Sequence, residues 1–303
     1  MTNHNGANAI WINNTTIALQ IEHFKNFEVY DVETGRSLFG SINGELGHKS
    51  FNDIIFYSRC ANRQLPKNET KRLYPKQEEG IWKFDLSSGK SSQIIKKKKI
   101  IKKFIKQNPD ITGNDVQILH VESNPAGNKI LFDYRHKKQP NDKRRKQLQG
   151  FVNADGSGVK WIPERPMHVV WYDNETMFGV EMDDKQKKMH RYDLEGNNLE
   201  LLAGSACHLG ISSDRNWFAG EFGFYKNEPD GFTRVYLYKR NETKPHAVLS
   251  AWQNAKITWR WVAHVNPSFS ADGKRLYFIR AVEGMDKFEA VYIDLEKAGI
   301  LRS

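Results

Sequence analysis

The chain has 303 residues, of which 39% are hydrophobic and 12% aromatic, and this supply of large apolar side chains excludes wholesale disorder. Lysine and arginine outnumber aspartate and glutamate by 46 to 36, and the net charge of +10 favours an anionic partner, either nucleic acid, a membrane surface or an acidic glycan. The two cysteines, Cys60 and Cys207, stand far apart without a C-x-x-C pairing, which argues against a disulfide framework or a cysteine zinc site and favours a reducing compartment.

No apolar run approaches the ~20 residues that a membrane-spanning helix needs. The first residues also lack the basic start and the apolar stretch of a signal peptide. We therefore expect a cytoplasmic protein from the sequence as written, and a periplasmic or secreted one if a leader has been removed.

A hairpin unit recurs along the chain. In most copies an alternating strand reaches an aspartate near its end, and a glycine-containing turn leads into a second strand. Period-two alternation predicts half-buried strands, and Asp and Gly supply the chemistry of the turn. The six copies begin at Phe27, Gly80, Gly150, Met189, Arg234 and Ala290.

A second unit precedes most of these hairpins and consists of a histidine head, a short strand, a polar turn and a more apolar strand. Its clearest copy is HVNPSFSADGKRLYFIRA, and the copies begin at His48, His120, His168, His208 and His264. Six copies of the outer hairpin in 303 residues give an average of about 50 residues per blade, which suits a propeller blade and exceeds the WD40 repeat.

We therefore predict an all-β protein, a β-propeller of four-stranded blades with the first strand of each blade innermost. Six blades can be counted, and the pattern leaves room for a seventh. We expect a single domain over residues 1–303. Its first blade lacks a histidine head and begins almost at Met1, so we expect that blade to be incomplete or completed by strand exchange between the two chain ends.

Much of the positive charge is concentrated in two runs, Lys96–Lys106 and Lys137–Lys146. The first predicts a short amphipathic helix near 94–107, and the second an exposed hairpin loop. Each run is either a solvated surface or a ligand-facing patch, and because no nucleic-acid-binding module is present, nucleic acid is the less favoured partner. The apolar positions of the predicted helix are Ile94, Ile101 and Ile105.

The five histidine heads share one position in the repeat, so we expect them to converge on one rim of the channel. Neutral imidazole is a general base near neutral pH and also the commonest transition-metal ligand. Taken singly, each histidine has a plainer interpretation as a strand cap that hydrogen-bonds to the next blade.

Arginines accompany two of these heads: Arg135 precedes His136 after the His120 hairpin, and Arg260 lies four residues before His264. Arginine binds carboxylates through its two-pronged guanidinium, although surface or inter-blade ion pairing is the alternative. A histidine base beside such arginines suits removal of the proton alpha to a uronate carboxylate.

At these blade heads the sequence resembles the TolB-like propellers of the oligogalacturonate lyase group and the related ulvan-lyase-like propellers. The resemblance is best from about Gly80 onward. The segments that carry it are the His120 unit with NPAGNKILF and Arg135-His136, GFVNADGSGVKWI, His168-Val-Val-Trp171, the His208 unit and His264 to Gly273.

This resemblance implies β-elimination of uronate-containing chains at a rim built from histidines, with or without a divalent metal such as Mn, Ca or Zn. It implies that His208 and His264 match metal-binding positions and that His168 matches the base of the oligogalacturonate type. In the ulvan type, His120 and His136 match the paired catalytic histidines. The chain departs from the pattern where His264-Val-Asn266-Pro267 replaces a His-Pro-His-Pro segment, and its blade count falls below the usual seven.

The sequence thus favours a carbon–oxygen lyase acting on an anionic, uronate-containing oligosaccharide or polysaccharide. The alternative is a catalytically inactive propeller that binds an acidic glycan or a protein partner. A third hypothesis is nucleic-acid binding by the basic helix and loop. The expected catalytic residues are His120, His136, His168, Arg135 and Arg260, and the expected metal ligands are His208, His264 and Asn266.

Overall fold

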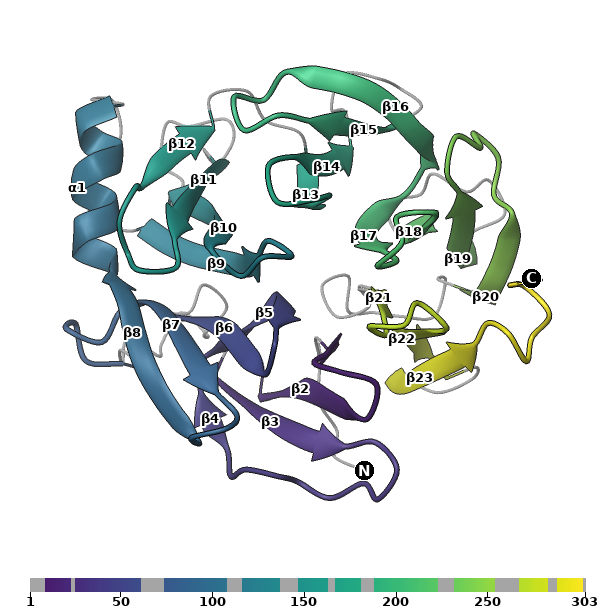
Figure 1. Cartoon of the computed structure of the whole chain (residues 1–303), viewed down its shortest axis with the longest axis horizontal. Coiled ribbons are helices and arrows are strands. Elements are labelled where there is room, and N and C mark those ends of the chain that lie inside the picture. Colours follow the sequence, from purple (N-terminus) through teal and green to yellow (C-terminus); the bar gives the residue numbers. More distant parts are fainter. Residues whose placement is uncertain are drawn as a thin grey trace.

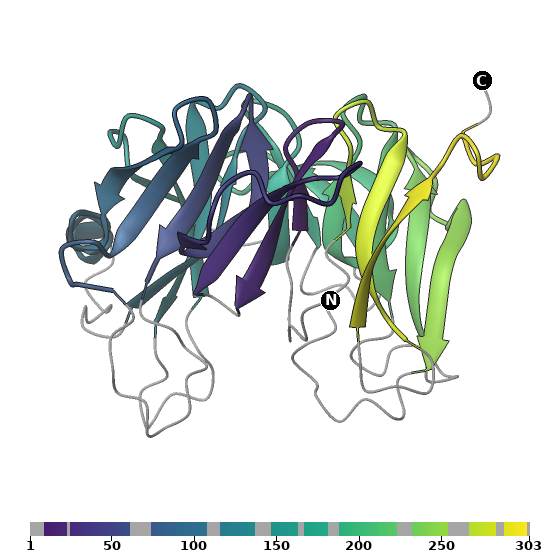
Figure 2. The same cartoon turned by 90° about the horizontal axis from the view of Figure 1, so that it is seen from below.

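The structure is a computed structural model in which six blades of antiparallel strands are arranged around a central axis (Figure 1). It describes residues 9–22, 25–60, 74–107, 116–136, 147–162, 167–180, 188–222, 232–253, 267–282 and 288–301. The predicted all-β propeller is confirmed, with six blades. Figure 2 shows the blades side-on, with the helix seen along its axis at the outer edge.

Each of the first five blades consists of four consecutive strands. Blade 1 has β1 (Ala9–Trp11), β2 (Thr16–Glu22), β3 (Asn26–Asp31) and β4 (Ile42–Asn43), and blade 2 has β5 (Glu45–Phe51), β6 (Ile54–Arg59), β7 (Gly80–Asp85) and β8 (Lys90–Lys96). Blade 3 has β9 (Val116–Ser123), β10 (Lys129–His136), β11 (Gln147–Asn153) and β12 (Lys160–Ile162), and blade 4 has β13 (Met167–Trp171), β14 (Met177–Val180), β15 (Lys188–Tyr192) and β16 (Asn198–Ser205).

Blade 5 has β17 (Cys207–Ile211), β18 (Trp217–Phe222), β19 (Phe232–Lys239) and β20 (Ala247–Gln253). The described part of blade 6 has β21 (Ser268–Phe269), β22 (Arg275–Ala281) and β23 (Phe288–Asp294). In every blade the first strand is innermost, as predicted.

The aspartates of the predicted hairpin turns act as the repeat indicated. Asp31 Oδ1 accepts hydrogen bonds from the backbone N–H and hydroxyl of Thr34, both at 2.7 Å. Asp85 Oδ1 accepts the backbone N–H groups of Ser87 at 2.9 Å and Ser88 at 3.2 Å. Because these carboxylates satisfy turn donors that the strand ladder leaves over, these two outer hairpins reverse at their aspartates.

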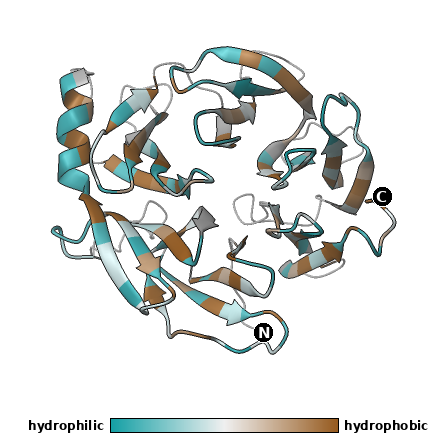
Figure 3. Cartoon of the chain, in the orientation of Figure 1, coloured by the Kyte–Doolittle hydropathy of each residue, from teal (hydrophilic) through white to brown (hydrophobic). Residues whose placement is uncertain are grey.

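The core is divided among the seams between neighbouring blades. The described residues form six apolar clusters, one at each seam. At the seam that closes the ring, Trp11 and Ile17 of blade 1 pack with Tyr277 and Ile279 of blade 6. Figure 3 shows the hydrophobic residues along the strands of every blade. Among the described residues no strand of blade 1 pairs with a strand of blade 6, and side-chain packing joins the two blades there.

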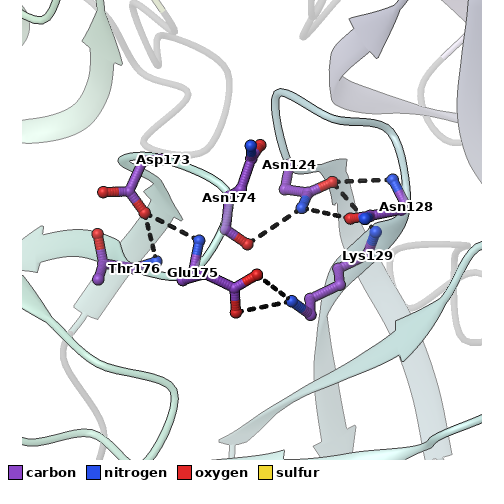
Figure 4. A network of polar contacts seen from close by, with 7 residues as sticks. All are labelled: Asn124, Asn128, Lys129, Asp173, Asn174, Glu175 and Thr176. Carbon is purple, nitrogen blue, oxygen red and sulfur yellow. Dashed lines mark hydrogen bonds and ion pairs between the residues drawn. The ribbon is translucent and has the colours of Figure 1, made fainter.

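The hairpin turns between first and second strands connect neighbouring blades at one end of the ring. At the seam of blades 3 and 4, Asn124 Nδ2 donates to the Asn174 carbonyl at 3.1 Å, and Lys129 Nζ lies 2.6 and 2.7 Å from the carboxylate oxygens of Glu175 (Figure 4). At the closing seam the backbone N–H of Asp272 donates to Asn14 Oδ1 at 3.3 Å. These contacts fix the rotation of one blade against the next.

The predicted basic helix is present as α1 (Lys97–Gln107), on the outer edge beside β8 and β12 (Figure 1). Its buried face is Ile100 and Phe104, flanked by the half-buried Ile101 and Ile105. The placement of Ile94 on the helix was wrong, because β8 continues to Lys96 through its pairing with β7 and keeps that residue in the strand.

No helix in the described ranges has the length and apolar character needed to cross a membrane. The second basic run, Lys137–Lys146, lies outside the described residues.

Candidate functional site

The histidine heads of three successive blades lie in one irregularity of the inner strand. In blade 3 Leu119 pairs with Asp133 and Glu122 with Leu131, so three steps along β9 oppose two along β10. His120 and Val121 are therefore two residues set against Phe132, which is a β-bulge.

The same bulge recurs in blades 4 and 5. His168 and Val169 oppose Gly179, and His208 and Leu209 oppose Gly220. In blade 2 the register also shifts between Leu46 and Ser50, the stretch that contains His48. His120, His168 and His208 thus occupy equivalent bulge positions of their inner strands.

The backbone at two of these histidines has left-handed angles, with φ of 51° at His120 and 48° at His208. An L-residue in this region is disfavoured by roughly 1–2 kcal/mol, and glycine is the usual occupant of such a bulge position. Histidine, like asparagine and aspartate, is enriched several-fold among the exceptions. Strained backbone of this kind is concentrated at active sites and ligand sites, so it marks His120 and His208 as candidates for a functional role.

His208 has a carboxylate partner. Its Nδ1 contacts Oε1 of Glu221 on β18, whose side chain is fully buried, while the His208 side chain is 11% exposed. A carboxylate that accepts the Nδ1 proton fixes the imidazole tautomer and ring orientation, and it makes Nε2 the basic nitrogen. The pair therefore has the geometry of an oriented general base.

An acidic side chain occupies the equivalent position in blade 3. Asp133 pairs with Leu119 as Glu221 pairs with Cys207, one residue before the histidine in each case. Asp133 is buried, and its Oδ1 accepts a hydrogen bond from Gln149 Nε2 at 3.3 Å. Blade 4 has Val180 at this position, so two of the three bulged blades have an acid opposite the residue that precedes the histidine.

The seam beside these bulges is held by Glu122 and Trp171, both of them buried. Glu122 Oε1 accepts the backbone N–H of Trp171, and the Trp171 indole N–H donates to the Glu122 carbonyl, each at 3.0 Å. Because Glu122 follows His120 by two residues on β9, this exchange ties the His120 bulge to blade 4.

Only two of the predicted site residues have side chains within the described part of the structure. His120 is half-buried, and His208 is the other predicted residue whose side chain is described. Arg135 and His136 end β10 and His168 lies in β13, but their side chains lie outside the described part, as do Arg260, His264 and Asn266 altogether.

Sequence reasoning missed Glu221 and Asp133. An acid in an alternating strand is usually interpreted as solvent-facing, and neither residue follows a recognised motif. A usable signal existed: each is the fifth residue of a second strand, in KILFDYRH and in WFAGEF.

The expected metal site can be compared with the described residues only in part. Of the three expected ligands only His208 is described, and no group of three or more His, Cys, Asp or Glu in the described ranges is arranged to hold an ion. The other two expected ligands, His264 and Asn266, lie outside the described residues, so the expected divalent-metal site stays a prediction.

Comparison with known proteins supports the fold. The sequence matches no family model and no curated protein. Among solved structures, it is similar over 95% of its length to an oligogalacturonate lyase in complex with manganese, with 17% identity, a TM-score of 0.53 and 76% of that chain covered.

Two further structures are similar to a comparable extent. An oligogalacturonate lyase from Vibrio parahaemolyticus has 18% identity and a TM-score of 0.51, over 95% of this chain and 77% of that one. A luciferin-regenerating enzyme has 12% identity and a TM-score of 0.52, over 96% of this chain and 92% of that one. At these identities, and with such different activities, the similarities establish the propeller fold and leave function to be argued from the site.

Proposed function

We propose that this protein binds an anionic, uronate-containing oligosaccharide at the histidine end of its channel and cleaves it by β-elimination. The observation that carries the proposal is the recurring bulge, which presents histidines at equivalent positions and backs His208 with the buried Glu221. The oligogalacturonate lyases among the structures of similar fold and the net charge of +10 agree with an anionic sugar as ligand.

The chemistry requires a base, and we assign that role to His208. Its Nε2 takes the proton alpha to the uronate carboxylate, the electron pair left on that carbon forms a carbon–carbon double bond, and the bond to the glycosidic oxygen breaks. The departing oxygen acquires a proton, so the products are an unsaturated uronate and a new sugar end. Glu221 is a positioning residue, because it stabilises the imidazolium that forms.

The other residues expected from the sequence complete the proposed site. His120, His136 and His168 would share the rim with His208, and the arginines would neutralise charge that builds on the substrate carboxylate. For Arg135, Arg260, His264 and Asn266 these roles rest on the sequence.

The proposal is tested by incubating the protein with oligogalacturonate and a panel of other uronate oligosaccharides, with and without divalent metal. The expected result is a product with the ultraviolet absorbance of an unsaturated uronate. His208→Gln should slow its formation by about a hundredfold, within the range of general-base contributions. The matched control is His246→Gln, since His246 is 39% exposed and lies before β20, away from the bulges.

Absence of product across the panel would refute the lyase. If calorimetry then detected binding of the same sugars, the inactive glycan-binding propeller would be the correct function. Equal rates for the two histidine variants would refute the assignment of His208.

A further inference from the structure

A cluster of arginines surrounds one tyrosine at the opposite end of the propeller from the histidines. His168 lies near the start of β13, whereas Tyr172 directly follows its end. The guanidinium carbons of Arg191, Arg215 and Arg240 lie 4.8, 5.6 and 5.8 Å from the centroid of the Tyr172 ring. They come from β15, from the turn between β17 and β18, and from the end of β19, so the cluster lies at the seam of blades 4 and 5 (Figure 1).

Two of the three arginines have carboxylate partners. Arg191 Nη2 lies 3.0 Å from Asp173 Oδ2, and its Nη1 lies 3.9 Å from Glu200 Oε2. Arg240 Nη2 lies 3.2 Å from Glu200 Oε1. Three guanidinium groups and two carboxylates leave one positive charge over in this cluster.

The charge left over is on Arg215. Its side chain is half-buried, and in the described part of the chain it has no hydrogen bond or ion pair. The hydroxyl of Tyr172 is also buried without a hydrogen-bond partner there. The guanidinium donors of Arg215 are therefore available to an outside acceptor, and the buried phenol beside them lacks the partner that buried polar groups normally have.

The backbone at Arg215 gives independent support. Its φ is 60°, in the left-handed region, and its N–H donates to the Ser212 carbonyl at 2.9 Å. In the corresponding turn of blade 6, Gly273 has φ of 72° and donates to the Ser270 carbonyl at the same distance. In blade 3 the position is Gly127, with φ of 66°. An arginine thus stands where two sister turns use glycine, the residue that takes this conformation without strain.

We propose that Arg215, Arg191 and Arg240 form a binding site for an oxyanion of carboxylate or phosphate chemistry. The planar guanidinium of Arg215 supplies two parallel N–H donors that match either group. One surplus positive charge is neutralised by one singly charged group, so a carboxylate fits the charge balance better than a phosphate dianion. The strain at Arg215 is retained because the side chain reaches the Tyr172 ring from this turn.

The site is independent of the proposed lyase chemistry. It uses none of the histidines assigned to the lyase reaction. A negative lyase assay therefore does not contradict the anion site, and a lack of anion binding does not contradict the lyase proposal.

The test is a titration with acetate and, separately, with inorganic phosphate, followed by the 1H–15N signals of the arginine Nε–H groups, against chloride at equal ionic strength. We expect a saturable shift of the Arg215 signal with acetate or phosphate and not with chloride. The stronger of the two probes identifies the source of the oxyanion.

Arg215→Gly removes the guanidinium and places in this turn the residue that its sister turns use, so the variant is expected to fold. Acetate or phosphate binding, measured by calorimetry and by the remaining arginine signals, should weaken by about tenfold or more. Arg215→Asn, which tolerates the left-handed region, should do the same. The matched control is Asn241→Gly, because Asn241 is an exposed turn residue with φ of 66° whose replacement relieves the same strain without changing charge.

Retained binding in Arg215→Gly, or a wild-type response equal to that of chloride, would overturn the proposal and leave Arg215 as a contact between blades. Loss of binding in both Arg215 variants, with binding unchanged in Asn241→Gly, would support it.

Discussion

Replacing His208 by leucine should destabilise the protein far more than an exposed ion pair would. Glu221 is fully buried and His208 is 11% exposed, so water has little access to take over the lost contact. Removing the side chain that donates to a buried carboxylate leaves that charge uncompensated and destabilises by about 3–5 kcal/mol, whereas replacing both partners by apolar residues is often close to neutral. We therefore expect His208→Leu to cost about 3 kcal/mol, and the double variant with Glu221→Leu to recover about 2 kcal/mol of that loss.

The assay is urea unfolding of the wild type, both single variants and the double variant, with the free energies combined in a double-mutant cycle. The backbone strain of leucine at φ 48° cancels in the cycle, because it is present with and without Glu221. At roughly 2–4 °C per kcal/mol, the single His208 variant should melt roughly 6–12 °C lower. The control cycle uses Arg280 and Glu289, 47% and 38% exposed, whose coupling should stay below about 1 kcal/mol. Additivity at His208 and Glu221 within about 0.5 kcal/mol would refute the argument that the carboxylate holds the imidazole.

Three further outcomes are expected. Phe104→Ala, which removes a buried ring packed 4.6 to 6.0 Å from three other aromatic rings, should lower the free energy of unfolding by about 3–5 kcal/mol, and a loss below about 1 kcal/mol in urea unfolding would contradict this packing. Trp171→Phe should cost about 2–4 kcal/mol because it leaves the Glu122 carbonyl without its indole donor, and calorimetry showing an unchanged melting temperature would count against that bond. The Ser87 hydroxyl, followed by backbone N–H groups, lowers the pKa of Asp85, so this carboxylate stabilises the fold above its unfolded pKa of about 4 and loses that contribution as the pH falls through its lower folded value. Asp85→Asn should therefore flatten the acid limb of the stability curve, and an unaltered limb would refute the assignment.

Much of the fold followed from residues with a fixed role in turns. Asp31 and Asp85 mark hairpin reversals because a short carboxylate is the acceptor that such turns need. Strands with period-two alternation between these marks gave the four-stranded blades, and the lysine-rich run gave α1. The position of Ile94 could not be predicted well, because an apolar residue at a strand–helix junction satisfies both periods.

The candidate site could be predicted only in part. Alignment of the blades brought His120 and His208 to one position, but a bulge leaves no pattern of its own in a single strand. Glu221 was hidden because burial depends on neighbouring blades and not on local sequence. The arginine cluster assembles side chains from three separate elements, and its one local sign was Arg215 in SSDRN, where SADGK has glycine.

The bulges at the inner strands have a consequence for how such proteins diversify. One extra residue shifts the inward–outward alternation by one position, so the part of the strand before the bulge and the part after it follow separate patterns. Side chains on the part of the strand before the bulge therefore do not have to follow the alternation that packing between the blades requires after the bulge. Residues before the bulge can therefore be exchanged in one blade at a time, by evolution or by design, while the apolar packing between the blades is kept.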